Sequence, residues 1–146
     1  MQNGCKNIYQ NARNHAGFTQ EKASELISVS VESLRAYEGG RTTPPNDVVC
    51  QMVAVYGLQH LAYQHLMHSS EVARTCLPKI DIKELPDAIL RLQKEVTDFI
   101  RCRDELIDIT YDGVITAEER PRYDEILKEL DDIVGAIMAL KFAKQV

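Results

Sequence analysis

Residues 19–36 contain short polar side chains ahead of two stretches with helical spacing, and the second stretch carries one long cation. Thr19 and Ser30 each precede a stretch with helical spacing, so each can cap the start of a helix. The free N–H groups at a helix start attract phosphate. Arg35 is the long cation of the second stretch, and a guanidinium binds a guanine edge or a phosphate, while Val31 can pack on a thymine methyl. These groups have the chemistry to contact phosphates and base edges, and none of them indicates catalysis.

A second group of oxygen-bearing side chains surrounds Gly113. Aligned on this glycine, the segment resembles an EF-hand calcium loop. The five side-chain ligands would be Asp108, Thr110, Asp112, Thr116 and Glu119. The same segment also has a structural interpretation, in which Asp112-Gly113 forms a turn and Thr116-x-x-Glu119 is a capping box for the last helix. We favour the structural interpretation and expect no metal and no other cofactor.

No motif in the sequence indicates catalysis. There is no nucleophile motif and no glycine-rich phosphate loop. The cysteines lack metal-ligand spacing, and we expect free thiols that are mostly small core residues; they are Cys5, Cys50, Cys76 and Cys102. We expect the histidines on the surface or in interdomain packing; they are His15, His60, His65 and His68. The protein is therefore expected not to be an enzyme.

Five short helices are expected to position the first group of residues. Glycines and the Pro44-Pro45 pair separate stretches with helical spacing. The expected helices are near 6–15, 19–26, 30–38, 46–56 and 58–67. An apolar set should hold the second helix across the third: Leu26, Val29, Leu34 and Tyr37. The segment from Ser69 to Pro78 reads as a linker with room for one helical turn.

The second half of the chain predicts a long helical hairpin. One apolar stripe falls on a helix over 86–109, formed by Leu85, Ile89, Leu92, Val96, Phe99 and Leu106. A second stripe lies on a later helix, and at two of its positions either of two residues fits the spacing: Tyr123, Ile126 or Leu127, Leu130, Ile133 or Val134, Ile137 and Leu140. Ile115 is expected to fill the core between them. Two helices bury little alone, so we expect the stripes to continue onto the fifth helix or a second copy, and we favour a homodimer.

The run GFTQEKASELISVSVESLRAYEGGRTTPP, which starts at Gly17, resembles the Cro and phage-repressor (Xre-like) helix-turn-helix family. Relatives of this kind are carried on prophages and mobile elements. The resemblance covers residues 6–67, and it includes Thr-Gln at the start of the second helix and Tyr37-Glu38-x-Gly40-Arg41 after the third. It implies a DNA-binding transcriptional regulator that reads the major groove with the helix near 30–38.

The resemblance also assigns roles to residues. It implies that Gln20, Arg41 and Thr43 lie at the DNA backbone, and that Arg13 and Glu38 form a buried structural ion pair. The exposed side of the third helix would face the bases with Val31, Glu32, Arg35 and Ala36. With the helix caps, the expected DNA-binding residues are Thr19, Gln20, Ser30, Val31, Glu32, Arg35, Ala36, Arg41 and Thr43.

The charge distribution leaves an alternative open. Residues 1–60 hold five basic and five acidic side chains, so the net charge of −5 lies entirely in residues 61–146. Glu32 occupies a position where a carboxylate either accepts from a cytosine amino group or repels phosphate. The alternative is a protein-interaction module, antitoxin-like or an adaptor, that uses the acidic C-terminal hairpin.

The sequence thus predicts an all-α fold: a five-helix phage-repressor-like DNA-binding domain followed by a long C-terminal helical hairpin. The expected boundaries are 1–68 for the helix-turn-helix domain, 69–80 for a linker and 81–146 for a hairpin that dimerises or binds a partner. The expected partners are double-stranded DNA and a second copy, with a protein partner at the hairpin as a further expectation. No segment has a signal-peptide core or the length to span a membrane, so we expect a cytoplasmic protein.

Overall fold

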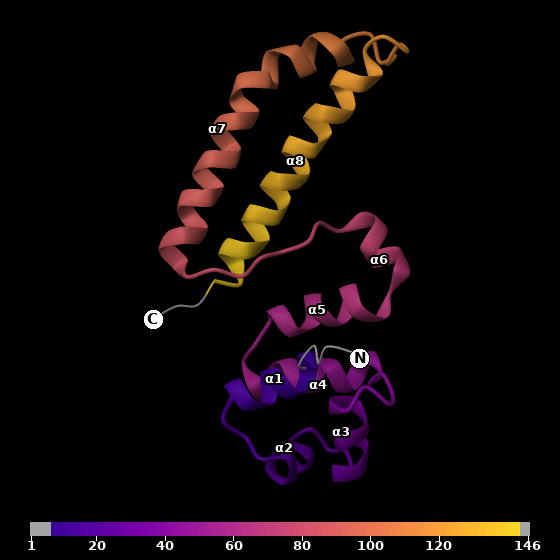
Figure 1. The fold of residues 1–146 in the computed structure, drawn as a ribbon, viewed down its shortest axis with the longest axis vertical. Helices are drawn as coiled ribbons and strands as arrows, with labels where there is room; N and C mark the ends of the chain where they lie inside the picture. Colours follow the sequence, from indigo (N-terminus) through magenta and orange to yellow (C-terminus); the bar gives the residue numbers. More distant parts are fainter. Residues whose placement is uncertain (1–6, 144–146) are drawn as a thin grey trace, which may run out of the picture. The chain divides into compact units, whose positions relative to one another are not determined.

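The computed structural model describes residues 7–143, and every regular element within them is a helix (Figure 1). The chain divides into two compact units, one ending at Leu77 and the other beginning at Pro78. The predicted fold class is confirmed, with short helices first and two long helices after them. The first unit contains α1 (Ile8–His15), α2 (Gln20–Leu26), α3 (Val31–Glu38), α4 (Asn46–Tyr56), α5 (His60–Ser69) and α6 (Glu71–Cys76), and the second contains α7 (Leu85–Thr110) and α8 (Arg120–Lys141).

The helices α2 and α3 begin at the caps that the sequence predicts. Thr19 Oγ1 accepts from the Lys22 amide at 3.1 Å, and Ser30 Oγ accepts from the Ser33 amide at 3.0 Å. Each bond satisfies one of the amides that a helix start leaves without a backbone partner. The bounds of the helix-turn-helix segment therefore follow from local sequence chemistry.

Two boundaries later in the first unit differ from expectation. The helix α5 begins at His60 and ends at Ser69, about two residues later than predicted. Ser70 then has an extended backbone, and its hydroxyl accepts from the Ala73 amide at 3.2 Å. This cap starts α6, a helix of six residues within the 69–80 segment that was expected to be a linker with room for one helical turn.

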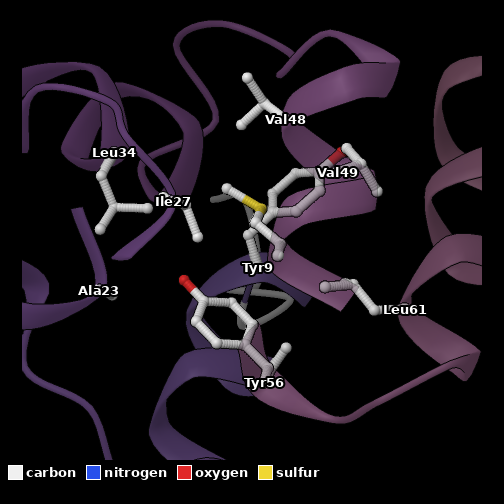
Figure 2. Packing of buried hydrophobic residues seen from close by; sticks show 10 residues of the cluster. Tyr9, Ala23, Ile27, Leu34, Val48, Val49, Tyr56 and Leu61 are labelled. Carbon is white, nitrogen blue, oxygen red and sulfur yellow. The ribbon is translucent and has the colours of Figure 1, made fainter. Parts of the chain in front are cut away.

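The core of the first unit gathers apolar side chains from α1 to α5 (Figure 2). The buried residues include Ala23, Ile27, Leu34, Met52 and Leu61, none of which has exposed surface. Leu34 holds α3 against this core, which leaves the opposite side of α3 free. Burial of each large aliphatic side chain stabilises the fold by about 1.5–3 kcal/mol.

One core prediction is wrong. Leu26 is 42% exposed, and Ile27 takes the buried position instead. Ile27 lies four residues after the buried Ala23 and therefore on the same side of the helix, whereas Leu26 falls at its edge. The other predicted members, Val29 and Tyr37, are partly buried against the core.

His65 is buried in this core and connects three helices. Its Nδ1 lies 2.8 Å from the Tyr9 hydroxyl and its Nε2 lies 3.0 Å from Asn46 Oδ1. An amide oxygen only accepts, so Nε2 carries the proton and Nδ1 accepts from Tyr9. The expectation of a surface or interdomain histidine is wrong for His65, because its partners come from α1 and α4 and helical spacing could not reveal them.

This arrangement predicts that acid destabilises the first unit. Burial lowers the pKa of His65 below its ordinary value of 6.5, and the charge of His68 lowers it further. The folded unit therefore binds a proton at His65 less readily than the unfolded chain, which takes one up as the pH falls below about 6.5. We expect the free energy of unfolding to fall between about pH 7 and pH 5, with no contribution from this group above that interval.

Urea unfolding followed by circular dichroism measures this effect. His65→Gln is the control, because glutamine can donate and accept but does not titrate in this range. The variant should lose less stability than the wild type over the same interval. Equal pH dependence in the two proteins would show that His65 does not carry the effect.

The second unit is an antiparallel pair of helices (Figure 1). Near the connecting loop, the buried side chains are Cys102, Ile109 and Ile126, with Ile115 and Phe99 packed beside them. Farther from the loop, the buried residues are Glu95 and four small residues that let the helices approach closely: Ala88, Gly135, Ala136 and Ala139. The loop end thus holds most of the bulky core of this unit.

The single apolar stripe predicted for α7 is in fact two stripes. Phe99 and Leu106 pack in the core of the hairpin, whereas Leu85, Ile89 and Val96 are exposed. An α-helix has 3.6 residues per turn, so positions repeated at alternating steps of three and four residues shift gradually around the helix axis. The predicted series therefore begins on the exposed side of α7 and ends on the side that faces α8. On α8, the choice left open by the sequence is resolved, because Ile126 is buried and Leu127 is exposed.

The ion pairs of α7 join residues within the same helix, with one exception. Lys94 and Arg101 both pair with Asp98, at 2.8 and 3.4 Å. Glu105 instead accepts from Arg122 of α8 at 2.6 Å, a bond that lowers the pKa of Glu105. This pair shows which residues of the two helices lie at the same level near the loop.

The cysteines are less buried than expected. Cys102 is buried, but Cys50 and Cys76 are exposed free thiols, and Cys5 lies outside the described residues. Cys50 directly follows the buried Val49 on α4, and one step of about 100° turns it outward. None of the described helices is long and apolar enough to cross a membrane.

Candidate nucleic-acid interface

A tight turn sets α3 against α2. Ser28 has a φ of +56°, and the Val29 amide donates to the Ser24 carbonyl at 3.0 Å. Ile27 and Leu34 are fully buried on the two sides of this turn. The turn and these anchors fix α3 with its outer side exposed, which is the arrangement that lets a helix enter the major groove.

Arg13 and Glu38 form a buried bidentate ion pair between α1 and the end of α3. Arg13 Nε donates to Glu38 Oε1 at 2.6 Å, and Nη2 donates to Oε2 at 2.9 Å. The third nitrogen, Nη1, donates to the Phe18 carbonyl at 2.7 Å. The hydrogen bonds to Glu38 raise the pKa of Arg13, although burial opposes them. The pair ties α1 and the segment before α2 to the end of α3.

Tyr56 lies close enough to this pair for both charges to act on it. Burial raises the pKa of Tyr56 to about 12, and the charge of Glu38 adds to the shift while that of Arg13 opposes it. Its hydroxyl has no hydrogen-bond partner in the described part of the chain. The hydroxyl therefore contributes little to the ion pair.

Gln20 links the buried pair to the surface. Its Nε2 donates to Glu38 Oε2 at 2.7 Å, and its Oε1 accepts from Arg35 Nε at 3.2 Å. Because a carboxylate only accepts, Glu38 orients the amide so that its oxygen faces Arg35. Arg35 Nη2 also donates to Glu21 Oε1 at 3.3 Å. The guanidinium is thus held beside the start of α2 in the free protein.

This set of contacts could not be predicted from the sequence. Arg35 is 15 positions from Gln20 and 14 from Glu21. Residue types alone give no reason to join them, because the contact depends on how α3 crosses α2. The resemblance identified Gln20 and Arg35 separately but did not predict that they touch.

The other residues assigned to DNA contact are accessible. Glu32, Arg41 and Thr43 are exposed, while Val31 and Ala36 are half-buried. The side chain of Arg41 has no ion pair or hydrogen bond within residues 7–143, so its charge is available. Of the remaining assigned residues, Thr19, Ser30 and Arg35 are exposed and Gln20 is half-buried.

Carboxylates limit the positive charge around α2. Lys22 pairs with Glu25 at 3.0 Å, and Arg35 pairs with Glu21. Both pairs are exposed, and such pairs are weak in water. An approaching phosphate or base can therefore displace the carboxylate from Arg35 without a large cost.

The calcium-loop residues are used in other ways. Asp108 and Thr110 lie within α7, and the Thr110 hydroxyl donates to the Leu106 carbonyl at 2.8 Å. The Thr116 amide and hydroxyl donate to the Glu119 carboxylate at 2.9 and 2.7 Å, and the Glu119 amide donates back at 3.3 Å. This is the geometry of a capping box. In addition, Asp112 Oδ1 accepts from the Val114 amide at 2.9 Å within the turn.

A different carboxylate cluster lies between α7 and α8. The carboxylates of Glu95, Glu129 and Asp132 lie within 4.8 Å of one another. Two cations accompany Glu95, Lys94 at 3.5 Å and Arg91 at 3.9 Å. The sequence analysis missed the cluster because its members come from two helices. These cations offset its charge.

Residues 10–66 match a protein-family model described as a helix-turn-helix domain. The match spans α1 to α5 except for the first two and last three residues of that range. No curated protein and no solved structure matches the chain. The N-terminal unit is therefore a helix-turn-helix domain, and this class of domain supports a role in DNA binding. The C-terminal helices lie outside the match.

Proposed function

We propose that this protein is a sequence-specific DNA-binding transcriptional regulator, a repressor of the phage-repressor (Xre-like) type that acts in the cytoplasm without catalysis. The observation that carries the proposal is the exposed outer side of α3 with Arg35 oriented by Gln20. A guanidinium in a fixed direction suits bidentate recognition of guanine. The helix-turn-helix match over residues 10–66 supports the same conclusion.

In the proposed complex, α3 lies in the major groove. Val31, Glu32, Arg35 and Ala36 face base edges, and Arg35 exchanges the carboxylate of Glu21 for a guanine or a phosphate. The backbone contacts come from groups beside the groove: Thr19, Gln20, Ser30, Arg41 and Thr43. The buried pair of Arg13 and Glu38 holds this surface together and makes no contact with DNA.

Regulation follows from occupancy of an operator. A dimer with one α3 per half-site reads a palindrome whose half-sites are about one helical turn apart. Such a complex represses a promoter that overlaps the operator. A homodimer is therefore part of the proposal.

The second candidate function is a protein-interaction module. It is favoured by the acidic balance of residues 61–146, which hold the whole net charge of −5. A partner with a basic surface would suit the hairpin, as in an antitoxin-like or adaptor protein. The helix-turn-helix unit would then serve protein contacts instead of DNA.

Binding to duplex DNA of random sequence distinguishes the two functions. A regulator should bind the pool at low salt with an affinity that falls steeply as salt rises, because each neutralised phosphate releases counterions. Fluorescence anisotropy of a labelled duplex measures this, and Arg41→Ala should reduce the salt slope by about one. A folded protein that does not bind at low salt would favour the interaction module.

Glu32 should weaken DNA binding, because it is an exposed carboxylate on the outer side of α3. We expect Glu32→Gln to raise the affinity for duplex DNA about two- to fivefold, since one repulsion from phosphate is removed. The same titration measures it. Glu118→Gln changes the net charge equally in the other unit and should leave the affinity unchanged. A fall in affinity with Glu32→Gln would indicate that the carboxylate accepts from a base instead.

A further inference from the structure

The outer side of α7 carries an apolar stripe that α8 does not cover. Its members are separated mostly by three or four residues, which keeps them on one side of a helix: Leu85, Ile89, Leu92, Val96, Ile100 and Ile107. Ile89 is 49% exposed and Ile100 is 56% exposed. The stripe lies about 100° around the helix from the buried residues Ala88 and Cys102.

The helix α8 carries a matching stripe. Its members repeat at steps of four and three, the spacing of a coiled-coil seam: Tyr123, Leu127, Leu130, Val134 and Ile137. Leu127, Val134 and Ile137 are exposed, and the other two are half-buried. This stripe is also about 100° from the side that α8 buries against α7, where Ile126 and Ala136 lie.

The two stripes face the same side of the hairpin. Viewed from the N-terminus of each helix, the stripe is rotated away from the buried side in the same direction about the helix axis. Because the two helices run antiparallel, these rotations turn both stripes toward the same side of the hairpin. Two contacts give the register of α7 against α8. Glu105 accepts a hydrogen bond from Arg122, and a Cβ added at Gly135 would lie 4.0 Å from the Arg91 guanidinium. Counting from these contacts pairs stripe residues at the same level: Ile100 with Leu127, Val96 with Leu130, Leu92 with Val134, and Ile89 with Ile137. We call this continuous surface the hairpin strip.

The hairpin strip is large enough for a stable interface. From Leu85 to Ile107 the helix advances about 33 Å, and two packed helices are about 20 Å wide, which gives roughly 650 Å². Stable complexes bury about 600–1,000 Å² on each partner, so this area lies at the lower end of that range. The first unit offers no comparable surface, because its exposed large apolar side chains within the described residues are Leu26, Leu66 and Val72. A surface that covers the hairpin strip must therefore come from another chain.

We propose that the hairpin strip packs against the same strip of a second copy and forms a four-helix bundle. A two-fold contact needs one surface that complements itself, and level apolar layers on both helices provide it. The strip contains no carboxylate, and the charged residue at its helical spacing is Arg103, between Ile100 and Ile107, so two net-acidic hairpins can meet there without bringing carboxylates together. The inference deepens the proposed function, since it names the surface through which two DNA-binding units pair.

A matched pair of substitutions on α7 tests the proposal in the full chain. Ile100→Glu puts a charge into the hairpin strip, and burial of an unpaired charge should raise the dimer dissociation constant roughly 100-fold or more. Leu90→Glu is the control, because Leu90 is 63% exposed but faces away from both the strip and α8. Sedimentation equilibrium should give a dimer for the wild type and Leu90→Glu, and a monomer for Ile100→Glu.

Circular dichroism checks that the variants keep their helices, and Ile89→Glu provides a second variant in the strip. A monomeric wild type would overturn the proposal, and so would a dimeric Ile100→Glu or equal weakening by Leu90→Glu. Binding to a single half-site separates this inference from the proposed function. If the chain binds DNA but does not dimerise, only the interface is wrong. If it dimerises but does not bind DNA, only the regulatory function is wrong.

Discussion

Replacing Arg13 by methionine is expected to lower the free energy of unfolding of the helix-turn-helix unit by about 3–5 kcal/mol. The substitution keeps an aliphatic side chain but leaves the carboxylate of Glu38 buried without its cation. The Glu38 side chain is only 2% exposed, so water cannot replace the lost charge. The Phe18 carbonyl also loses its donor. Urea unfolding followed by circular dichroism measures the loss.

Two controls distinguish a broken ion pair from a general packing defect. The double variant Arg13→Met and Glu38→Leu removes both charges, and it should be more stable than Arg13→Met alone. Tyr56→Phe removes a neighbouring hydroxyl that has no partner, so it should change stability by no more than about 1 kcal/mol. A double variant less stable than the single variant would contradict the assignment of the cost to an uncompensated charge.

Replacing Arg35 by alanine is expected to weaken binding to the operator by about 1–3 kcal/mol, or roughly 5- to 150-fold. Arg35 is the guanidinium that Gln20 orients on the outer side of α3, and alanine cannot replace its hydrogen bonds. The substitution removes no buried contact, so stability should stay within about 0.5 kcal/mol of the wild type. Titration of the wild type and variant on the same duplex measures the difference.

The way in which the affinity falls shows whether Arg35 contacts a base or a phosphate of the DNA. A guanine contact predicts relaxed specificity at one base pair, whereas a phosphate contact predicts a uniform loss and a salt slope smaller by about one. Arg101→Ala is the matched control, since it removes an exposed arginine from the other unit. If Arg101→Ala weakens binding as much as Arg35→Ala, net charge rather than α3 governs the affinity.

Local chemistry made the helix-turn-helix segment predictable. Thr19 and Ser30 are side chains that cap helices, and Pro45 can start a helix but not continue one. These properties depend on a few neighbouring residues, so the bounds of α2, α3 and α4 follow from the sequence. The pairing of Arg13 with Glu38 came from the resemblance to a family and not from spacing, because the two residues meet only in the folded unit.

What depends on the relative placement of helices was not predictable. Steps of three and four residues indicate that a helix has an apolar side but not which side meets its neighbour. This is why the Leu85 series, expected to be the core of the hairpin, includes residues that remain exposed. For the same reason, His65 was not expected in the core beside Tyr9, and Leu26 was predicted where Ile27 lies. Contacts between Gln20 and Arg35 likewise require the crossing of α2 and α3.

Selection from a library of random duplex DNA, followed by sequencing, tests the central claim most directly. It should be done at low salt with the wild type and with Arg35→Ala. We expect the wild type to recover a palindromic site with half-sites about one helical turn apart, and Arg35→Ala to recover it weakly or with relaxed specificity. If the folded wild type enriches no site, the protein does not read DNA through α3, and a protein partner of the acidic hairpin becomes the better account.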